Sequence, residues 1–404
     1  MYRKKIIDFT DKNKSFIWGL FLSTIIFQHI IGSIFLGILI TFSFFQFFQN
    51  KEINCCKNLL PITIYVVWGI SSLLWTTDIS NTINGIISSL PLILIPLLIS
   101  QYSDFKMDDF IKSSKVLSYC LLFYFFISFF YAVLLFLNDK NLGHFFYHDF
   151  VSIFENNAIY ISLAVAICIL IIFNSPHNKA KDYLTITFLS IFLLLLSSKN
   201  IIITTLILIF VSIFINKKQI RKATIVFSII VVLLLFLIFI NNPIKARFLS
   251  ELNFNAQYIW TGQDFYDYKF SGFEIRFFQW RILVEMIINN QVGFLGLGLH
   301  NVNYLLDQYF SYYNLYKGYF YINFHNQFLQ TLGELGIIGL LILLNVFRVF
   351  ISKSFLNKNK IEIMFTLLFL IAFLTESFLS RQKGVFLFAT LYGLFLKTKN
   401  TSFH

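Results

Sequence analysis

Long apolar runs separated by short polar segments make up most of this chain. A run of about 20 apolar residues can cross the roughly 30 Å hydrocarbon core of a bilayer as a helix. Because the runs are continuous rather than alternating, they predict membrane-spanning helices and not the strands of a barrel. The first run, residues 16–48, is long enough for a tight hairpin of two spans. It is too long for a signal peptide and has no small-residue cleavage site.

We expect an all-α polytopic membrane protein with about twelve spans. After the first hairpin, the predicted spans are residues 59–75, 83–100, 116–137, 157–174, 183–197, 200–215, 223–240, 330–350, 361–378 and 384–396.

Composition supports this class. Of the 404 residues, 57% are hydrophobic and 13% are charged, whereas a soluble domain carries about 25% charged residues. The formal net charge is +12, but the cations sit in short loops, so we expect no nucleic-acid partner. The cysteines indicate no disulfide framework: Cys55 and Cys56 fall in a predicted cytoplasmic loop, and Cys120 and Cys168 lie in apolar runs.

The positive residues orient the predicted spans. With the first residues inside, the alternate loops and both tails hold 22 of the 32 lysines and arginines, which is the positive-inside pattern. The chain is then a single integral membrane domain, 1–404, in a bacterial inner membrane. Residues 241–329 form a large periplasmic loop between the ninth and tenth spans. No internal repeat typical of transporters is visible.

The long loop is neutral and rich in tyrosine. Residues 242–333 hold six basic and six acidic residues and ten of the twenty tyrosines. Tyrosine can stack on sugar rings while its hydroxyl binds a polar group. The alternative is an interfacial aromatic belt, which explains most of these tyrosines individually.

Within this loop, Glu274–Asn289 has helical periodicity. Arg276 and Trp280 are four residues apart and share a face. Arg281 points elsewhere and faces Glu285, so an ordinary ion pair is the simpler explanation of Arg281. Arg276 has no acidic neighbour at that spacing, and its planar fork of donors suits phosphate oxygens.

Three cationic or titratable groups fall on the same predicted side of the membrane. Lys199 lies in a tight turn between spans, where a lysine is commonly a snorkelling anchor, and Arg276 lies in the loop helix. His325 opens the next membrane helix beside the amides Asn326 and Gln327. It is either a surface imidazole at a capped helix start or a general base that activates a hydroxyl.

Several residues near His325 have supporting roles in this interpretation. Gly333, Gly336 and Gly339 predict close helix packing, and Gly293–Gly298 predicts a turn without the context of a dinucleotide-binding loop. Glu334 lies inside the helix and is costly unless it is paired or faces water.

The last external loop holds Glu376, Arg381 and Lys383, and we expect Glu376 and Arg381 to support the site. No metal site is expected. His144 and His148 have ligand-like spacing near Asp149 but lack a flanking metalloprotease pattern, so a pair of surface residues is the simpler explanation.

The order of these motifs resembles the O-antigen ligase and polymerase superfamily of bacterial envelopes. The resemblance rests on Arg276-Phe-Phe-Gln-Trp280, the small-residue turn Gly293–Gly298, His325-Asn-Gln-Phe-Leu329 and Gly336-Ile-Ile-Gly339. The number of spans and the large loop near the end of the chain extend the resemblance over most of the sequence. The motifs that carry the resemblance cover only residues 197–203 and 274–340.

The resemblance implies a GT-C-like glycosyltransferase that works without metal or cofactor and inverts the anomeric centre. It would transfer a glycan from undecaprenyl diphosphate to a hydroxyl of lipid A–core or of another glycan, on the periplasmic side. His325 and Arg276 would be catalytic. The donor and glycan would be bound by Lys199, Arg276, Arg281, Asn326, Gln327 and Trp280.

Two positions depart from the family pattern. Lys199 stands where relatives usually have arginine after serine, which keeps the charge but loses the bidentate fork. Asn156 and Asn157 open a span at which relatives often carry histidine.

Three other functions stay open. Ligase and polymerase differ in their acceptor, and the motif His325-Asn-x-x-Leu favours ligase. A lipid-glycan transporter would place charges or broken helices at mid-membrane, whereas the charges here cluster at one surface. A purely structural scaffold leaves the loop chemistry unexplained.

Overall fold

A computed structural model describes residues 2–50, 59–101, 105–175, 180–215, 245, 249, 254–356 and 360–397. Every regular element in these residues is a helix. The predicted span 223–240 and the predicted cytoplasmic cluster at residues 216–222 lie outside the described residues.

Within the described residues, three segments are long and apolar enough to cross a membrane: Ile79–Ser100, which joins α4 (Ile79–Ser89) to α5 (Pro91–Ser100), then α6 (Met107–Asp139) and α16 (Gln327–Leu356). Shorter apolar helices occupy other predicted spans. The described part of the chain is therefore all-helical, and the chain is a multi-pass membrane protein. The count of twelve spans and the side on which each loop lies stay predictions.

The remaining helices of the bundle overlap predicted spans, although the first of them begins at Tyr2, inside the predicted cytoplasmic tail. They are α1 (Tyr2–Ser23), α2 (His29–Asn50), α3 (Leu60–Ser71), α8 (Ala158–Asn174), α9 (Ala180–Leu195), α10 (Lys199–Ile215), α17 (Lys360–Thr375) and α18 (Gln382–Lys397).

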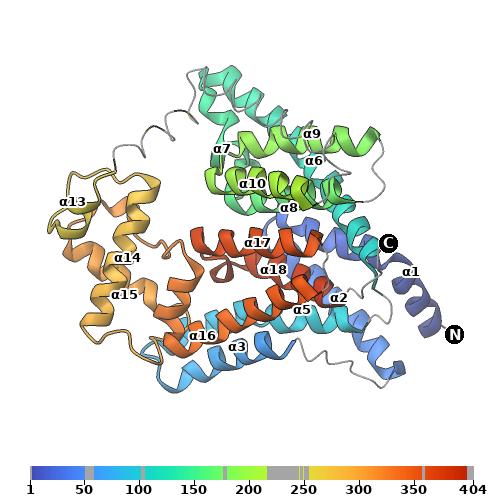
Figure 1. The fold of residues 1–404 in the computed structure, drawn as a ribbon, viewed down its shortest axis with the longest axis horizontal. Coiled ribbons are helices and arrows are strands. Elements are labelled where there is room, and N and C mark those ends of the chain that lie inside the picture. The colour runs from blue at the N-terminus through green and yellow to red at the C-terminus, as the bar shows by residue number, and fades with distance from the viewer. Residues whose placement is uncertain are drawn as a thin grey trace.

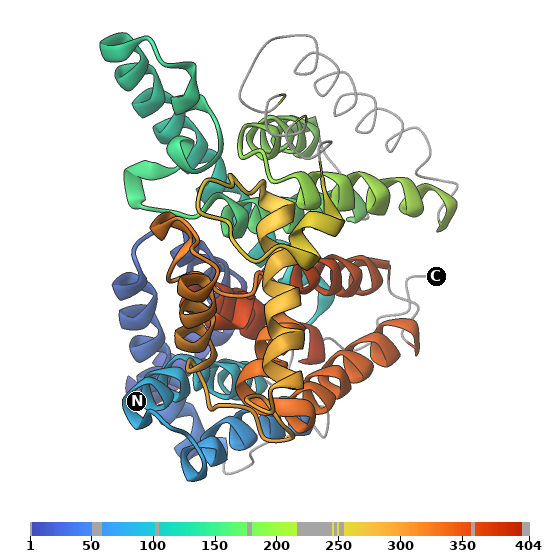
Figure 2. The same cartoon turned by 90° about the vertical axis from the view of Figure 1, so that its left-hand side faces the viewer.

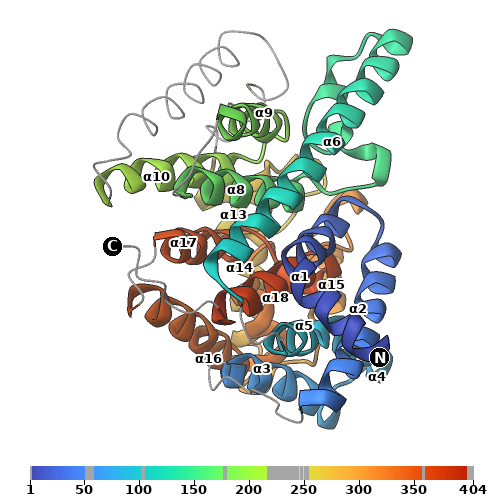
Figure 3. The same ribbon diagram turned by 90° about the vertical axis from the view of Figure 1, so that its right-hand side faces the viewer.

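In Figure 1, α8, α9 and α10 lie above α17 and α18, and α3, α5 and α16 lie below them. α18 packs along α5 and α16 along α3, whereas α8 contacts α6, α9, α10 and α17. Almost every residue of α8 is buried, as expected for a helix that is apolar all round. Seen from the side of α1, α1 and α2 stand in front of the bundle (Figure 3).

One span is longer than predicted. The expected range 116–137 is part of α6, which begins at Met107 and ends at Asp139. Its first turn is polar, and the Asp109 carboxylate accepts from the backbone N–H of Lys106 at 3.1 Å. Acidic side chains stabilise a helix N-terminus. The polar first turn therefore allows α6 to begin before the apolar run that predicted the span.

The long loop forms a compact unit with its own apolar core. It contains α13 (Ala256–Thr261), α14 (Gly272–Ile288) and α15 (Val302–Tyr312), whose buried side chains include Phe278 and Phe310. α14 confirms the helix predicted at residues 274–289, and the Ser271 hydroxyl caps it by accepting from the backbone N–H of Glu274. In Figure 2, α14 crosses in front of the end of the bundle.

α16 is not a continuous helix, contrary to the prediction for residues 330–350. Gly336 has φ 66° and ψ −168°, which breaks it. The predicted turn at residues 293–298 is present, and its backbone lies against the break: a Cβ on Gly336 would stand 2.0 Å from the carbonyl oxygen of Phe294. Only glycine has both the backbone freedom and the space needed here.

The backbone carbonyl oxygens next to the break accept hydrogen bonds from donors outside the helix. The backbone N–H of Leu297 donates to Gly333 O and that of Gly298 to Glu334 O. The indole N–H of Trp68 donates to Leu335 O at 3.0 Å. Backbone groups must be paired where water is scarce, so the turn holds the broken helix in place.

Candidate active site

A cleft lies where the loop unit meets the bundle. Its cavity volume is about 240 Å³. Its lining comes from α7 (Tyr147–Phe150), the start of α8, the α9–α10 turn, the start of α14, the residue before α16 and the end of α17. The lining residues are Tyr147, His148, Asn157, Ile159, Ser197, Ser198, Lys199, Asn200, Ile201, Gly272, Phe273, Ile275, Arg276, His325 and Thr375.

The structure thus brings together Lys199, Arg276 and His325, three residues that the sequence placed only on one side of the membrane. They are far apart in the chain and come from different elements. Their shared cleft is a geometric finding, and their roles stay proposals.

Lys199 is presented by a sharp reversal between α9 and α10. Ser197 adopts φ 52° and its hydroxyl donates to Leu195 O at 3.0 Å. α10 begins at Lys199 itself. The lysine therefore lies directly after the turn, where it lines the cleft.

Arg276 projects from the first turns of α14. Its Nη1 donates to Gly272 O at 3.1 Å. Its Nε is buried and has no hydrogen-bond partner among the described residues. A buried donor without a partner is costly, so the guanidinium has hydrogen-bonding capacity for a ligand in the cleft.

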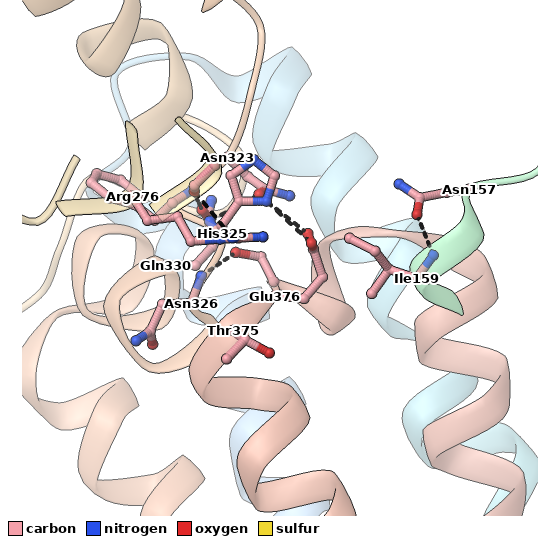
Figure 4. Close-up of polar contacts among 12 residues, drawn as sticks. Asn157, Ile159, Arg276, Asn323, His325, Asn326, Gln330, Thr375 and Glu376 are labelled. Carbon is pink, nitrogen blue, oxygen red and sulfur yellow. Dashed lines mark hydrogen bonds and ion pairs between the residues drawn. The ribbon is translucent and has the colours of Figure 1, made fainter. Parts of the chain in front are cut away.

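His325 is held between two polar partners (Figure 4). Its backbone adopts φ 46°, and its N–H donates to Asn323 Oδ1 at 3.1 Å. Its ring nitrogen Nδ1 lies 3.2 and 3.1 Å from the two carboxylate oxygens of Glu376. The side chain of Glu376 is only 4% exposed.

The charge of Glu376 assigns the His325 tautomer. Burial alone raises the pKa of Glu376, but the field and hydrogen bond of His325 and the field of Arg276 outweigh it, so the pKa lies below its usual value. The ionised carboxylate only accepts hydrogen bonds, so Nδ1 is the donor. Nε2 of a neutral His325 ring is then an acceptor, as a general base requires.

A second histidine in the cleft was assigned no role from the sequence. His148 lies on α7, with its ring centroid 3.8 Å from that of Tyr147. Its Nδ1 accepts from the backbone N–H of Ala158 at 3.1 Å, so a neutral His148 carries its proton on Nε2. Asn157 caps α8 beside it, accepting from Ile159 N–H at 2.8 Å (Figure 4).

His148 was considered only as half of a pair with His144. The structure separates the two: His144 Nε2 pairs with Asp139 at 2.7 Å, whereas His148 faces the cleft. Among the described residues, no three or more His, Cys, Asp or Glu side chains form a cluster suited to a metal ion.

Arg281 lies in the core of the loop unit and does not line the cleft. Its Nε pairs with Glu285 at 2.7 Å, the ion pair that the spacing predicted. The same guanidinium donates to Ile259 O, Gly262 O and the Tyr313 hydroxyl. In the structure, Arg281 therefore holds the loop unit together and is not among the residues that line the cleft.

Three further substrate-binding candidates also lie outside the cleft lining. Trp280 packs against Phe273 and Phe277. The Asn326 carboxamide oxygen caps α16 by accepting from the backbone N–H groups of the second and third residues after it. Gln327 accepts from Leu379 N–H at 2.7 Å, which ties α16 to the loop that carries Glu376.

The other supporting candidates have different environments. Buried Glu334 accepts from His300 N–H at 3.1 Å and from Gln330 Nε2 at 2.8 Å, so it is paired as its depth requires. Arg381 is exposed, and Lys383 contacts Asn156. Of these candidates, Glu376 is the one that touches a cleft residue proposed as catalytic.

Comparison with known families gives a match for part of the chain. Residues 184–344 match the family described as O-Antigen ligase. The matched segment includes Lys199, Arg276 and His325, but ends before Glu376 and begins after His148. No curated protein matches the chain.

Proposed function

We propose that this chain, a member of the O-antigen ligase superfamily through residues 184–344, is an O-antigen ligase. It transfers a glycan from undecaprenyl diphosphate to a lipid A–core hydroxyl at the periplasmic face of the bacterial inner membrane. The family match itself supports a membrane glycan-processing enzyme of the ligase and polymerase family, acting on lipid-linked glycans.

The observation that carries the proposal is the composition of the cleft. Two cations, Lys199 and Arg276, line the same cleft as His325, whose ring is oriented by the Glu376 carboxylate. A diphosphate leaving group needs positive charge, and an acceptor hydroxyl needs a base. This cleft offers both.

In the proposed mechanism, the donor diphosphate lies against Arg276 and Lys199. The buried Nε–H of Arg276 gains a phosphate oxygen as its partner, and the lysine adds a second positive charge. As the bond between the anomeric carbon and the phosphate oxygen breaks, its electron pair passes to the diphosphate. Fixed cations stabilise the charge that develops there.

Proton transfer runs through His325 in this proposal. Nε2 accepts the proton of the acceptor hydroxyl while that oxygen forms the new bond to the anomeric carbon. Attack from the side opposite the diphosphate inverts the anomeric centre. Glu376 holds Nδ1–H and stabilises the imidazolium that forms, which is the role of an orienting carboxylate beside a base.

The polymerase alternative uses the same chemistry on another acceptor. If the acceptor is a second lipid-linked repeat unit, the roles of Arg276, Lys199 and His325 are unchanged. The motif beginning at His325 favours ligase.

The transporter alternative gains no support from the broken helix. The carbonyls of residues 333–335 at the break are paired with the loop and with Trp68. They are not offered to a substrate at mid-membrane, as broken helices of transporters are.

Deleting the gene and separating the envelope glycans on a gel tests the function. A ligase deletion leaves bare core and accumulates long lipid-linked polymer. A polymerase deletion leaves a core that bears one repeat unit. An unchanged glycan profile would exclude both functions.

Complementation tests the residues. Arg276→Ala and His325→Ala should fail to restore the missing glycan. Lys317→Ala removes an exposed cation from the same loop, and His144→Ala removes a histidine outside the cleft; both controls should restore it. Full restoration by both Arg276→Ala and His325→Ala would refute the mechanism.

A further inference from the structure

The backbone that leads to His325 is bound by buried side-chain amides from two helices. Gln279 Nε2, on α14, donates to the carbonyl oxygen of Asn323 at 2.8 Å. Gln330 Oε1, on α16, accepts from the backbone N–H of Phe324 at 3.1 Å. Both glutamine side chains are fully buried, so two separate elements hold the residues directly before His325.

This backbone needs support, because His325 has a left-handed conformation with φ 46°. A residue with a Cβ keeps such a conformation only where the surrounding structure imposes it. From this conformation the ring reaches Glu376, with Nδ1 at 3.1 Å from a carboxylate oxygen (Figure 4). On the other side of His325, the backbone N–H of Asn326 donates to Ser377 Oγ at 3.3 Å. The strained backbone therefore sets where the ring stands relative to Glu376.

The amide of Gln279 is explained by its bond to Asn323. Its own oxygen, Oε1, is buried and has no hydrogen-bond partner among the described residues. A buried polar atom without a partner is costly, and an apolar side chain of similar length would avoid that cost. The donation to the Asn323 carbonyl oxygen is the interaction that an apolar side chain could not provide.

The same helix carries the arginine of the cleft. Arg276 lines the cleft and lies three residues before Gln279, which is about 4.5 Å along the helix axis. The field of Arg276 also reaches Glu376. A shift of Asn323 relative to α14 would therefore move His325 relative to both the cation and the carboxylate.

We propose that Gln279 is a positioning residue for His325. Its hydrogen bond to Asn323 holds the imidazole at a fixed place relative to Arg276 and Glu376, and Gln279 itself does not touch the substrate. The effect on catalysis rests on the proposed function, whereas the positioning rests on the hydrogen bonds described above.

A double-mutant cycle in thermal unfolding tests the positioning without a transfer assay. Gln279→Met keeps the length of the side chain and removes its donor, and Glu376→Gln removes the charge that meets His325. Residues that act through a shared partner are not additive. Glu376→Gln should therefore lower the unfolding midpoint of the Gln279→Met protein by less than about half as much as it lowers that of the wild type. The full chain in detergent at pH 7 is used.

Gln308→Met is the matched control for this cycle. It makes the same change at an exposed glutamine of α15, so Glu376→Gln should keep its full effect in that background. Equal effects of Glu376→Gln in the wild type and in Gln279→Met would overturn the proposal. If Gln279→Met does not fold, Gln279→Asn, which withdraws the amide by one methylene, enters the same cycle with the same expectation.

Kinetics then separate positioning of His325 from a general disturbance of α14. Gln279→Met should bind the undecaprenyl diphosphate-linked donor with a Kd within about twofold of the wild type but lose at least about tenfold in kcat, because a misplacement of about 1 Å can slow a reaction by about 10²-fold. A disturbed α14 would instead weaken donor binding through Arg276. Weaker donor binding with unchanged kcat would overturn the proposal.

The two assays distinguish failure of this proposal from failure of the proposed function. A wild-type protein that transfers no glycan would contradict the proposed function, and the unfolding cycle would still decide whether Gln279 positions His325. A wild-type protein that transfers glycan, together with a Gln279→Met protein of equal kcat, would overturn the positioning role alone.

Discussion

Glu376 fixes one ring nitrogen of His325, and the Ala158 backbone fixes one ring nitrogen of His148. The partners are opposite in kind, because a carboxylate accepts and an N–H donates. The neutral rings therefore present opposite functions at Nε2: an acceptor on His325 and a donor on His148. In the proposed reaction, the acceptor on His325 would take the proton of the hydroxyl. The donor on His148 would bind a sugar or phosphate oxygen.

Replacing Glu376 by Gln should slow transfer. The amide no longer stabilises the imidazolium that forms on His325, so we expect kcat to fall by about 10²-fold, the lower end of the contribution of acid–base catalysis, with KM little changed. Transfer assays with purified protein measure this. Asp267→Asn makes the same change at an exposed carboxylate of the loop and should leave kcat unaltered.

The Glu376 substitution also gives a pH-dependent difference in stability. The folded pKa of Glu376 lies below 4.5, so its ionised form stabilises the fold above the unfolded pKa. This contribution is lost as the pH falls through the folded pKa. Wild type should therefore unfold at a higher temperature than Glu376→Gln at pH 7, and the gap should close in acid. A gap independent of pH would contradict the ion pair.

His148 should be needed as a donor rather than as an aromatic ring. His148→Gln places an amide N–H near the position of Nε2, whereas His148→Phe keeps the ring without its nitrogens. A hydrogen bond to a charged oxygen contributes about 1.5–3 kcal/mol, so we expect the Phe variant to lose roughly tenfold to a hundredfold in kcat/KM. Equal activity of the two variants would exclude the donor role.

At the scale of elements, the break in α16 positions the site. The helix segment that follows His325 ends at Gly336, where the turn at residues 293–298 packs backbone against backbone. Three glycines at spacing three predicted close packing of a continuous helix. Gly333 does allow a close approach, to Val302, but Gly336 breaks the helix, because its geometry depends on a distant turn that helical periodicity does not reveal.

Alanine substitutions should show which glycines of the break and of the turn are required for stability. Gly336 has φ +66° and Gly296 has φ +73°, and a Cβ on either would stand within 2.5 Å of backbone atoms. Each substitution should destabilise the protein by at least about 2 kcal/mol, since backbone strain alone costs about 1–3 kcal/mol. Gly293→Ala is the control, because nothing lies within 4 Å of its Cβ position. Thermal unfolding in detergent measures all three, and equal midpoints would contradict the account.

For the whole molecule, the sequence predicted helices well because a bilayer requires long apolar runs. Helices lie at every predicted span inside the described residues. The sequence also predicted that Lys199, Arg276 and His325 lie on the same side of the membrane. It did not predict the contact between His325 and Glu376, which are 51 residues apart, or the place of His148. Such contacts follow from how helices pack, and no local pattern encodes them.

Thiol labelling tests the orientation of the whole bundle. We predict that Lys317→Cys, in the loop before α16, reacts with a membrane-impermeant maleimide in intact spheroplasts. Lys106→Cys, just before α6, should react only after permeabilisation. Both positions are exposed, so access depends on the side of the membrane. The reverse pattern would place the cleft in the cytoplasm and contradict the proposed reaction.

The most direct test of the proposed cleft measures donor binding and transfer on the same purified variants, with undecaprenyl diphosphate-linked glycan as donor and lipid A–core as acceptor. His325→Ala should bind the donor with the wild-type Kd but transfer at least about 10²-fold more slowly. Arg276→Ala should lose donor affinity. Transfer at the wild-type rate by His325→Ala would contradict the account.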